Sequence, residues 1–97
     1  MNCVNLTGRI ASLKTFEKCT FITVATPQKN NYKEADFVDC VAFGTTGGFI
    51  EKYFEIGQFI EIAGHITKTE HNGEYRTKVV IDNASFCGEM RPPKVPA

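Results

Sequence analysis

The order of its regular segments most constrains the fold of this 97-residue chain: three strand-like runs, one helical run and two further strand-like runs. The strand-like runs are rich in β-branched and aromatic residues and end near glycine or proline, as β-strands do. Asn72-Gly73 separates the last two runs and predicts a hairpin, because both residue types tolerate a positive φ. We expect strands over residues 3–10, 19–26, 36–43, 58–69 and 74–84.

One run between the third and fourth strands has the periodicity of a helix. The apolar residues that recur there at 3.6-residue spacing are Phe49, Ile50, Tyr53 and Phe54. We expect a helix of two to three turns that Thr45 or Thr46 caps and Gly57 ends. This layout is that of the OB-fold, a partly open Greek-key barrel whose second and third strands bind oligonucleotides or oligosaccharides. The sequence therefore predicts an all-β, five-stranded OB-fold barrel with one short α-helix between strands 3 and 4.

The length admits one domain, which we place at residues 1–88, followed by a flexible proline-containing tail at 89–97. No apolar run is long enough for a transmembrane helix, and the N-terminus lacks a secretory signal, so we expect a cytoplasmic protein. Four cysteines occur without a C-x-x-C pair and are expected to be reduced structural thiols. His65 and His71 lack the spacing of metal ligands, so we expect no metal and no cofactor.

The chain has eleven basic and eleven acidic residues, and its formal net charge is zero. The charges are unevenly distributed, because residues 1–35 carry five basic and two acidic side chains. Residues 36–64 carry one basic and five acidic side chains. One face or edge of the fold can therefore be basic although the whole chain is neutral.

Alternation along the strands predicts which side chains face outward. Small apolar residues suit a crowded barrel interior, and the residues placed inside are Ile22, Val24, Val38, Cys40, Ala42, Ile60, Ile62, Gly64 and Ile66. The outward residues of the second and third strands are then Phe21, Thr23, Ala25, Phe37, Asp39, Val41 and Phe43. Exposed rings near lysines suit single-stranded nucleic acid, because bases stack on rings and cations meet phosphates. A one-residue slip in register would instead bury the rings, and a subunit interface would also cover them.

Segments along roughly residues 2–87 share a distinctive order and spacing. They read MNCVNLTGR (1–9), FITVAT (21–26), ADFVDCVAFG (35–44), EKYFEIGQ (51–58), IEIAGHI (60–66) and YRTKVV (75–80). Together they resemble the bacterial and phage single-stranded-DNA-binding protein family, and the third segment is the most diagnostic. The resemblance implies a non-enzymatic OB-fold protein that binds and protects single-stranded DNA, independently of sequence, during replication, recombination or repair.

The resemblance also indicates site residues. Phe37 and Phe43 match the family's stacking aromatics, which agrees with their outward placement and adds to the expectation for Phe21. His71 lies near another stacking position, and Tyr32 lies in the loop that carries a further aromatic. We expect phosphate contacts from Arg9, Lys14, Lys18, Lys29, Lys33, Lys68, Arg76 and Lys78. The family forms dimers or tetramers, so a homo-oligomer is expected. The expected partner is single-stranded DNA, and no small-molecule substrate is expected.

Other classes of function stay open. An OB-fold protein-interaction adaptor of a replisome or primosome is favoured by the zero net charge, the absence of tryptophan and Asp39, whose carboxylate repels phosphate. Catalysis has little support, because the glycine-rich segment 44–48 lacks the Lys-Ser/Thr ending of a phosphate-binding loop. The family's acidic-tipped tail is not seen, which a truncated chain or a small phage or mobile-element version would explain.

Overall fold

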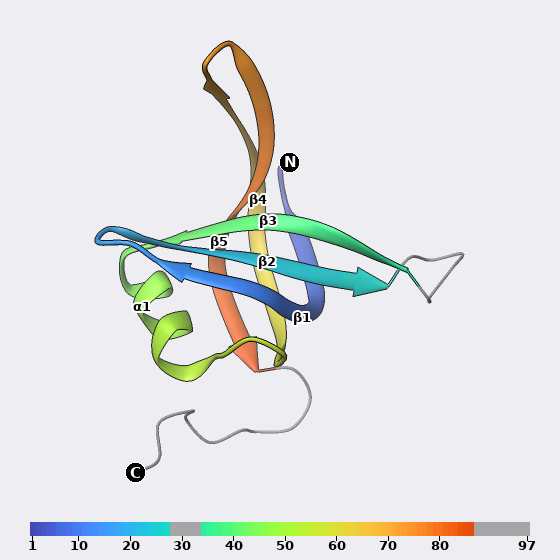
Figure 1. The fold of residues 1–97 in the computed structure, drawn as a ribbon, viewed down its shortest axis with the longest axis vertical. Helices are drawn as coiled ribbons and strands as arrows, with labels where there is room; N and C mark the ends of the chain where they lie inside the picture. The colour runs from blue at the N-terminus through green and yellow to red at the C-terminus, as the bar shows by residue number, and fades with distance from the viewer. Residues whose placement is uncertain (28–33, 87–97) are drawn as a thin grey trace.

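The computed structural model describes residues 1–27 and 34–86, where five strands and one helix follow the predicted order (Figure 1). The elements are β1 (Val4–Thr15), β2 (Cys19–Pro27), β3 (Ala35–Phe43), α1 (Gly44–Tyr53), β4 (Phe59–His71) and β5 (Glu74–Phe86). The predicted strand ends differ from these by at most two residues, except at the end of β1. The prediction of five strands with one helix between β3 and β4 is confirmed.

β1 is longer than predicted because it pairs with two different strands. Residues 4–9 pair with β4, and residues 9–15 pair with β2. A β-bulge between Ile10 and Ser12 shifts the register where the strand passes from one partner to the other. The bulge also interrupts the alternation of side chains, so the sequence pattern by itself predicts an end at Ile10.

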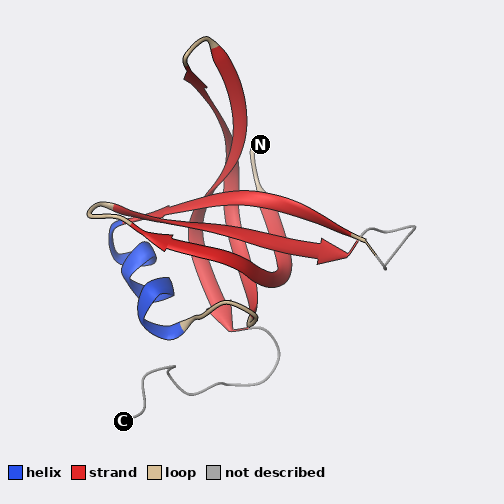
Figure 2. Cartoon of the chain, in the orientation of Figure 1, coloured by secondary structure: helices blue, strands red, loops and turns tan. Residues whose placement is uncertain are grey.

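The strands close into a barrel in the order β1-β2-β3-β5-β4, with β4 returning to β1. The neighbouring strands are antiparallel except β3 and β5, which pair in parallel at Cys40↔Val79 and Val41↔Val80. This short parallel pairing closes the barrel that the sequence predicts as partly open. The tip of the β4–β5 hairpin projects from the barrel, and α1 lies toward the other end of the molecule (Figure 2).

Closure brings the backbones of neighbouring strands close together at two glycines. A Cβ atom at Gly8 would overlap the carbonyl oxygen of Ala25 and lie 2.8 Å from Cγ1 of Val24. A Cβ atom at Gly64 would overlap the carbonyl oxygen of Val80. No larger residue fits at either position unless the backbone shifts, so both contacts require glycine.

The barrel interior is aliphatic and largely as predicted. The predicted inward residues that are at most 3% exposed are Ile22, Val24, Cys40, Ala42, Ile60 and Ile62. Gly64 is buried too, and the half-buried Val38 packs against the same cluster. Ile50 of α1 and the following Phe54 are fully buried, and the Phe54 ring stacks on Phe86 with centroids 4.9 Å apart. Each such side chain contributes about 1.5–3 kcal/mol by burial, so α1 is held by its apolar face.

The predicted threonine cap of α1 is wrong. The N-cap residue is Phe43, which makes no side-chain capping bond, and Thr45 and Thr46 lie within the first turn. The buried hydroxyl of Thr20 in β2 instead donates to the carbonyl oxygen of Gly47, at 3.2 Å. A tertiary hydrogen bond therefore anchors the start of the helix where the sequence predicts a local one.

The predicted end of α1 at Gly57 is also wrong. The helix ends at Tyr53, and the backbone N–H of Phe54 donates to the carbonyl oxygen of Ile50. Phe54 is already extended, with φ of −121° and ψ of 153°. Burial of the Phe54 ring under the barrel stops the helix before the glycine is reached.

Two predicted exposures are wrong. Ile66, expected inside, is 46% exposed because it lies where β4 leaves the barrel for the hairpin. Val41, expected on the exposed face of β3, is only 4% exposed. Its register partners are Phe21 on β2 and Val80 on β5, so a strand flanks it on each side. The outer face of β3 is consequently open at Phe37, Asp39 and Phe43 and covered at Val41.

The cysteines differ in their surroundings. Cys3 is exposed, Cys19 is half-buried and Cys40 is buried, and all three are free thiols. Cys87 and the predicted tail at 89–97 lie outside the described residues. Within the described part of the chain, no helix is long and apolar enough to cross a membrane.

Replacing Gly8 with alanine should lower the free energy of unfolding by about 1–3 kcal/mol, because the added methyl group overfills the contact with β2. The matched control is Gly48→Ala in α1, where a Cβ atom meets nothing within 4 Å. That change should stabilise the protein by about 0.5–1 kcal/mol, because alanine is the better helix former. Urea unfolding followed by circular dichroism measures both, and equal midpoints for Gly8→Ala and wild type would contradict the close contact.

Candidate nucleic-acid interface

A groove of about 520 Å³ separates the β2–β3 face from the hairpin that continues β4 and β5 beyond the barrel. We call this hairpin, residues 67–78, the arm; it rises at the top of Figure 1. The residues that line the groove are Phe21, Ile22, Thr23, Asp39, Cys40, Thr69, Arg76, Thr77 and Lys78. β2 and β3 therefore form one wall of the groove, and the arm forms the other.

Two phenylalanine rings flank this groove on β3. Phe37 is 65% exposed and Phe43 is 55% exposed, so both stand outward as predicted. Their register partners on β2 are Ala25 and Cys19, neither of which is large enough to cover a ring. Asp39 lies between them on the same face and is also exposed. The predicted register is confirmed here, while the stacking role of the rings stays a prediction.

Phe21 joins the groove to a further ring that the sequence analysis missed. The rings of Phe21 and Phe16 meet edge to face, with centroids 5.4 Å apart. Phe16 is 55% exposed and lies just after β1, before the tight turn to β2. Alternation predicts the faces of strand residues only. Phe16 lies in a turn, so the sequence pattern did not predict that its ring lies beside Phe21.

Three of the predicted cations lie directly over aromatic rings. The Lys78 ammonium lies 5.2 Å from the Phe21 ring centroid, and the Lys68 ammonium lies 5.1 Å from that of Tyr75. The Arg9 guanidinium carbon lies 4.2 Å above the Phe59 ring. Such pairs at exposed sites are worth about 0.5–1 kcal/mol each. Each pair places a flat apolar surface beside a positive charge. A base can stack on such a surface, and a phosphate can meet such a charge.

Tyr75 and Phe59, 63% and 40% exposed, were not among the predicted site residues. Tyr75 could have been found from the Asn72-Gly73 turn, because the hairpin register pairs Glu70 with Tyr75 and puts Lys68 diagonally across from it. Phe59 could not have been found from the sequence, because its contact with Arg9 depends on the pairing of β1 with β4.

The remaining predicted cations are dispersed. Arg9 lies outside the groove, where its Nη1 also donates to the carbonyl oxygen of Gly57 at 2.9 Å. Lys14 is the register partner of Phe21, and Lys18 lies in the turn between β1 and β2. Arg76 lines the groove and lies 3.7 Å from Glu74. Lys29, Tyr32, Lys33 and the side chain of His71 lie outside the described residues.

The groove also contains a carboxylate and a buried thiol. The Thr23 hydroxyl donates to Oδ1 of Asp39 at 3.2 Å, which ties the carboxylate to β2. Burial, and to a lesser extent the charge of Asp39, raises the pKa of the Cys40 thiol to about 12. The Cys40 thiol also donates a hydrogen bond to the carbonyl oxygen of Val38, at 3.6 Å. Cys40 is therefore a packing residue and not a nucleophile.

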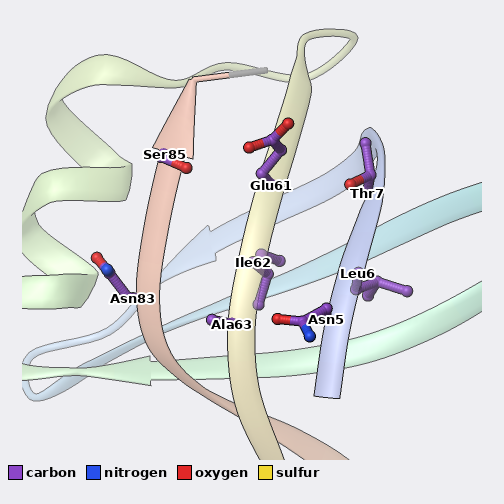
Figure 3. A pocket seen from close by; sticks show the side chains of 8 residues that line it. All are labelled: Asn5, Leu6, Thr7, Glu61, Ile62, Ala63, Asn83 and Ser85. Atoms are coloured by element: carbon purple, nitrogen blue, oxygen red, sulfur yellow. The ribbon is translucent and has the colours of Figure 1, made fainter. Parts of the chain in front are cut away.

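A second hollow, of about 180 Å³, lies on the outer face of β1, β4 and β5 (Figure 3). Its lining residues are Asn5, Leu6, Thr7, Glu61, Ile62, Ala63, Asn83 and Ser85. None of them is basic or aromatic, and Glu61 carries a negative charge. The lining of this hollow lacks both features of the groove, so the hollow is a poor site for nucleic acid, although Arg9 lies over Phe59 farther along β1 and β4.

The chain is similar in sequence to curated single-stranded DNA-binding proteins. No protein-family model matches the chain. A single-stranded DNA-binding protein from Fusobacterium nucleatum is 38% identical over 64 residues, which cover 63% of this chain and 42% of that protein. Another from Clostridium perfringens is 32% identical over 69 residues, which cover 66% of this chain and 46% of that protein. The chain thus spans less than half the length of the curated relatives it matches, and the resemblance to their family is confirmed.

Solved structures share the fold at low identity. A mitochondrial single-stranded DNA-binding protein from S. cerevisiae gives a TM-score of 0.74 at 12% identity, covering 93% of this chain and 98% of that one. A small single-stranded DNA-binding protein from Mycoplasma pneumoniae gives 0.70 at 18%, covering 94% and 99%. The dimeric N-terminal domain of PriB from Thermoanaerobacter tencongensis gives 0.70 at 19%, covering 91% and 98%. The predicted OB-fold is confirmed.

The environment of Cys40 predicts a large difference in thiol reactivity. At pH 8 only ~10⁻⁴ of a thiol with this raised pKa is thiolate, so iodoacetamide should alkylate Cys40 far more slowly than the exposed Cys3. Mass spectrometry of peptides from the timed reaction measures both rates. In urea the two rates should converge, whereas equal rates in the folded protein would contradict the burial of Cys40.

Proposed function

We propose that this chain binds single-stranded DNA, without catalysis and largely independently of sequence, through the groove and the outer face of β3. The observation that carries the proposal is the pair of exposed rings, Phe37 and Phe43, on the strand that forms the groove wall. Large apolar rings standing in water call for a partner. Unpaired bases are a fitting one, because every base has a face that stacks on a ring.

The cation–ring pairs suggest how a strand of DNA enters the groove. A base that stacks on Phe21 displaces the Lys78 ammonium from the ring face, and the released ammonium can meet the adjoining phosphate. Tyr75 and Lys68 offer the same exchange on the arm. A duplex cannot use these surfaces, because its bases already stack on one another inside the helix.

Single-stranded DNA-binding proteins among the relatives and structural neighbours support this function. The dimeric state of one structural neighbour supports a homo-oligomer. We further propose that the protein protects single strands during replication, recombination or repair, in the cytoplasm where these occur. The replisome or primosome adaptor is the rival, and it needs no affinity for oligonucleotides.

Fluorescence anisotropy with labelled oligo(dT) and a duplex of equal length tests the function. The single strand should bind more tightly, because only unpaired bases can stack on the exposed rings. Salt should weaken binding. The logarithm of the binding constant should fall against the logarithm of the salt concentration with a slope of about −0.7 for each phosphate contacted. Equal affinity for the duplex would contradict stacking, and no binding of oligo(dT) would favour the adaptor.

The salt dependence of two lysine variants locates the phosphate contacts. Lys78→Ala should make the slope shallower by about 0.7, because it removes one groove cation. Lys52→Ala is the matched control, since Lys52 lies over the Tyr53 ring on α1 in the same type of pair outside the groove. Equal slopes for both variants would place the phosphates elsewhere.

Replacing Phe37 or Phe43 with alanine should weaken oligo(dT) binding by about 1–3 kcal/mol, the value of one stacked base. Neither change should lower the melting temperature appreciably, because an exposed ring leaves no cavity. Ile62→Ala should do the reverse and cost about 2–5 kcal/mol of folding stability, because Ile62 is 3% exposed.

Ile56→Ala is the control for these ring variants, because it removes a side chain that is 62% exposed and lies outside the groove. It should change neither binding nor melting. Normal binding by folded Phe37→Ala and Phe43→Ala proteins would show that the rings do not stack on bases.

A further inference from the structure

We infer that Asp39 gives the groove a preference for bases that carry an exocyclic amino group, so that cytosine binds more tightly than thymine. Asp39 would accept a hydrogen bond from that amino group. This inference rests on the proposed binding of single-stranded DNA and adds a modest base preference to it. The observation behind it is an exposed carboxylate in a groove that is also lined by an aromatic ring, Phe21, and two cations, Arg76 and Lys78.

The position of Asp39 puts it within reach of a stacked base. Phe37 is two residues away on the same strand face, so their Cα atoms are about 6.6–6.8 Å apart. Phe21 is a diagonal neighbour on β2, at about 7–8 Å, because Phe21 pairs with Val41 and Thr23 pairs with Asp39. The exocyclic groups of a pyrimidine stacked on either ring would therefore lie within reach of the carboxylate.

The carboxylate is oriented and still has room for a further donor. The Thr23 hydroxyl donates to Oδ1 at 3.2 Å and limits how far the side chain can rotate. A carboxylate accepts about four hydrogen bonds, so this contact leaves most of its capacity free. Asp39 forms no salt bridge within residues 1–27 and 34–86, so neither groove cation, Arg76 or Lys78, is already paired with the carboxylate.

Cytosine and thymine differ where this acceptor would meet them. Cytosine presents the N4 amino group, a donor, and thymine presents O4, an acceptor, at the same ring position. A carboxylate therefore attracts cytosine and repels thymine, and it accepts from the N6 amino group of adenine as well. Its repulsion of phosphates is common to all sequences, so it lowers total affinity without altering the preference.

The test compares dissociation constants for oligo(dC) and oligo(dT) of equal length at one salt concentration, by fluorescence anisotropy. The ratio Kd(dT)/Kd(dC) should fall about tenfold in Asp39→Ala relative to wild type, because the variant loses the acceptor. Binding of oligo(dT) should tighten in the same variant. Asp39→Asn has an amino donor as well as a carbonyl acceptor and can serve either base, so its ratio should also fall toward that of Asp39→Ala.

Glu61→Ala is the matched control, because it removes the same charge from the second hollow, outside the groove, and should leave the ratio unchanged. Melting curves identify folded variants, and Asp39 is exposed, so both substitutions should fold. A ratio in Asp39→Ala within about twofold of wild type would overturn this inference while the proposed function stands. Failure of the wild type to bind either oligonucleotide would overturn the proposed function itself.

Discussion

The contact between backbones at Gly8 and Gly64 is the constraint on which the rest of the molecule depends. A side chain at either position would overlap a carbonyl oxygen, that of Ala25 at Gly8 and that of Val80 at Gly64. The paired strands can therefore lie this close together only because both residues are glycine. In the same barrel β1 pairs with both β4 and β2, and β5 pairs with β3. β3 then has a partner on each side, which makes its outer face a rigid support.

Barrel closure also separates the aromatic residues by role. Phe54 and Phe86 stack beneath the barrel beside α1, where they contribute to folding. Phe37 and Phe43 stand on the outer face of β3, where aliphatic packing on the inner side already supplies the stability. Binding and folding therefore depend on different rings, and substitutions can change one with little effect on the other.

The groove shows how a chain with no net charge can present a basic surface. Lys78 and Arg76 come from the arm and line the groove, and Lys78 lies over the Phe21 ring, while Glu61 belongs to a different face. The charge that matters is local, because screening confines each contribution to about 8–10 Å at ordinary ionic strength. Asp39 interrupts this surface, and Thr23 holds it in place.

The sequence by itself determined the elements, the hairpin turn and the outward placement of Phe37 and Phe43. These follow from short-range rules: side chains alternate along a strand, and the turn at Asn72 and Gly73 has the positive φ values, 53° and 81°, that its residues tolerate. Only the tertiary structure decided the second half of β1, the ends of α1 and the exposure of Ile66. It also decided which cation covers which ring, as with Lys78 on Phe21. These features join segments far apart in the chain, and local pattern carries no information about which segments barrel closure brings together.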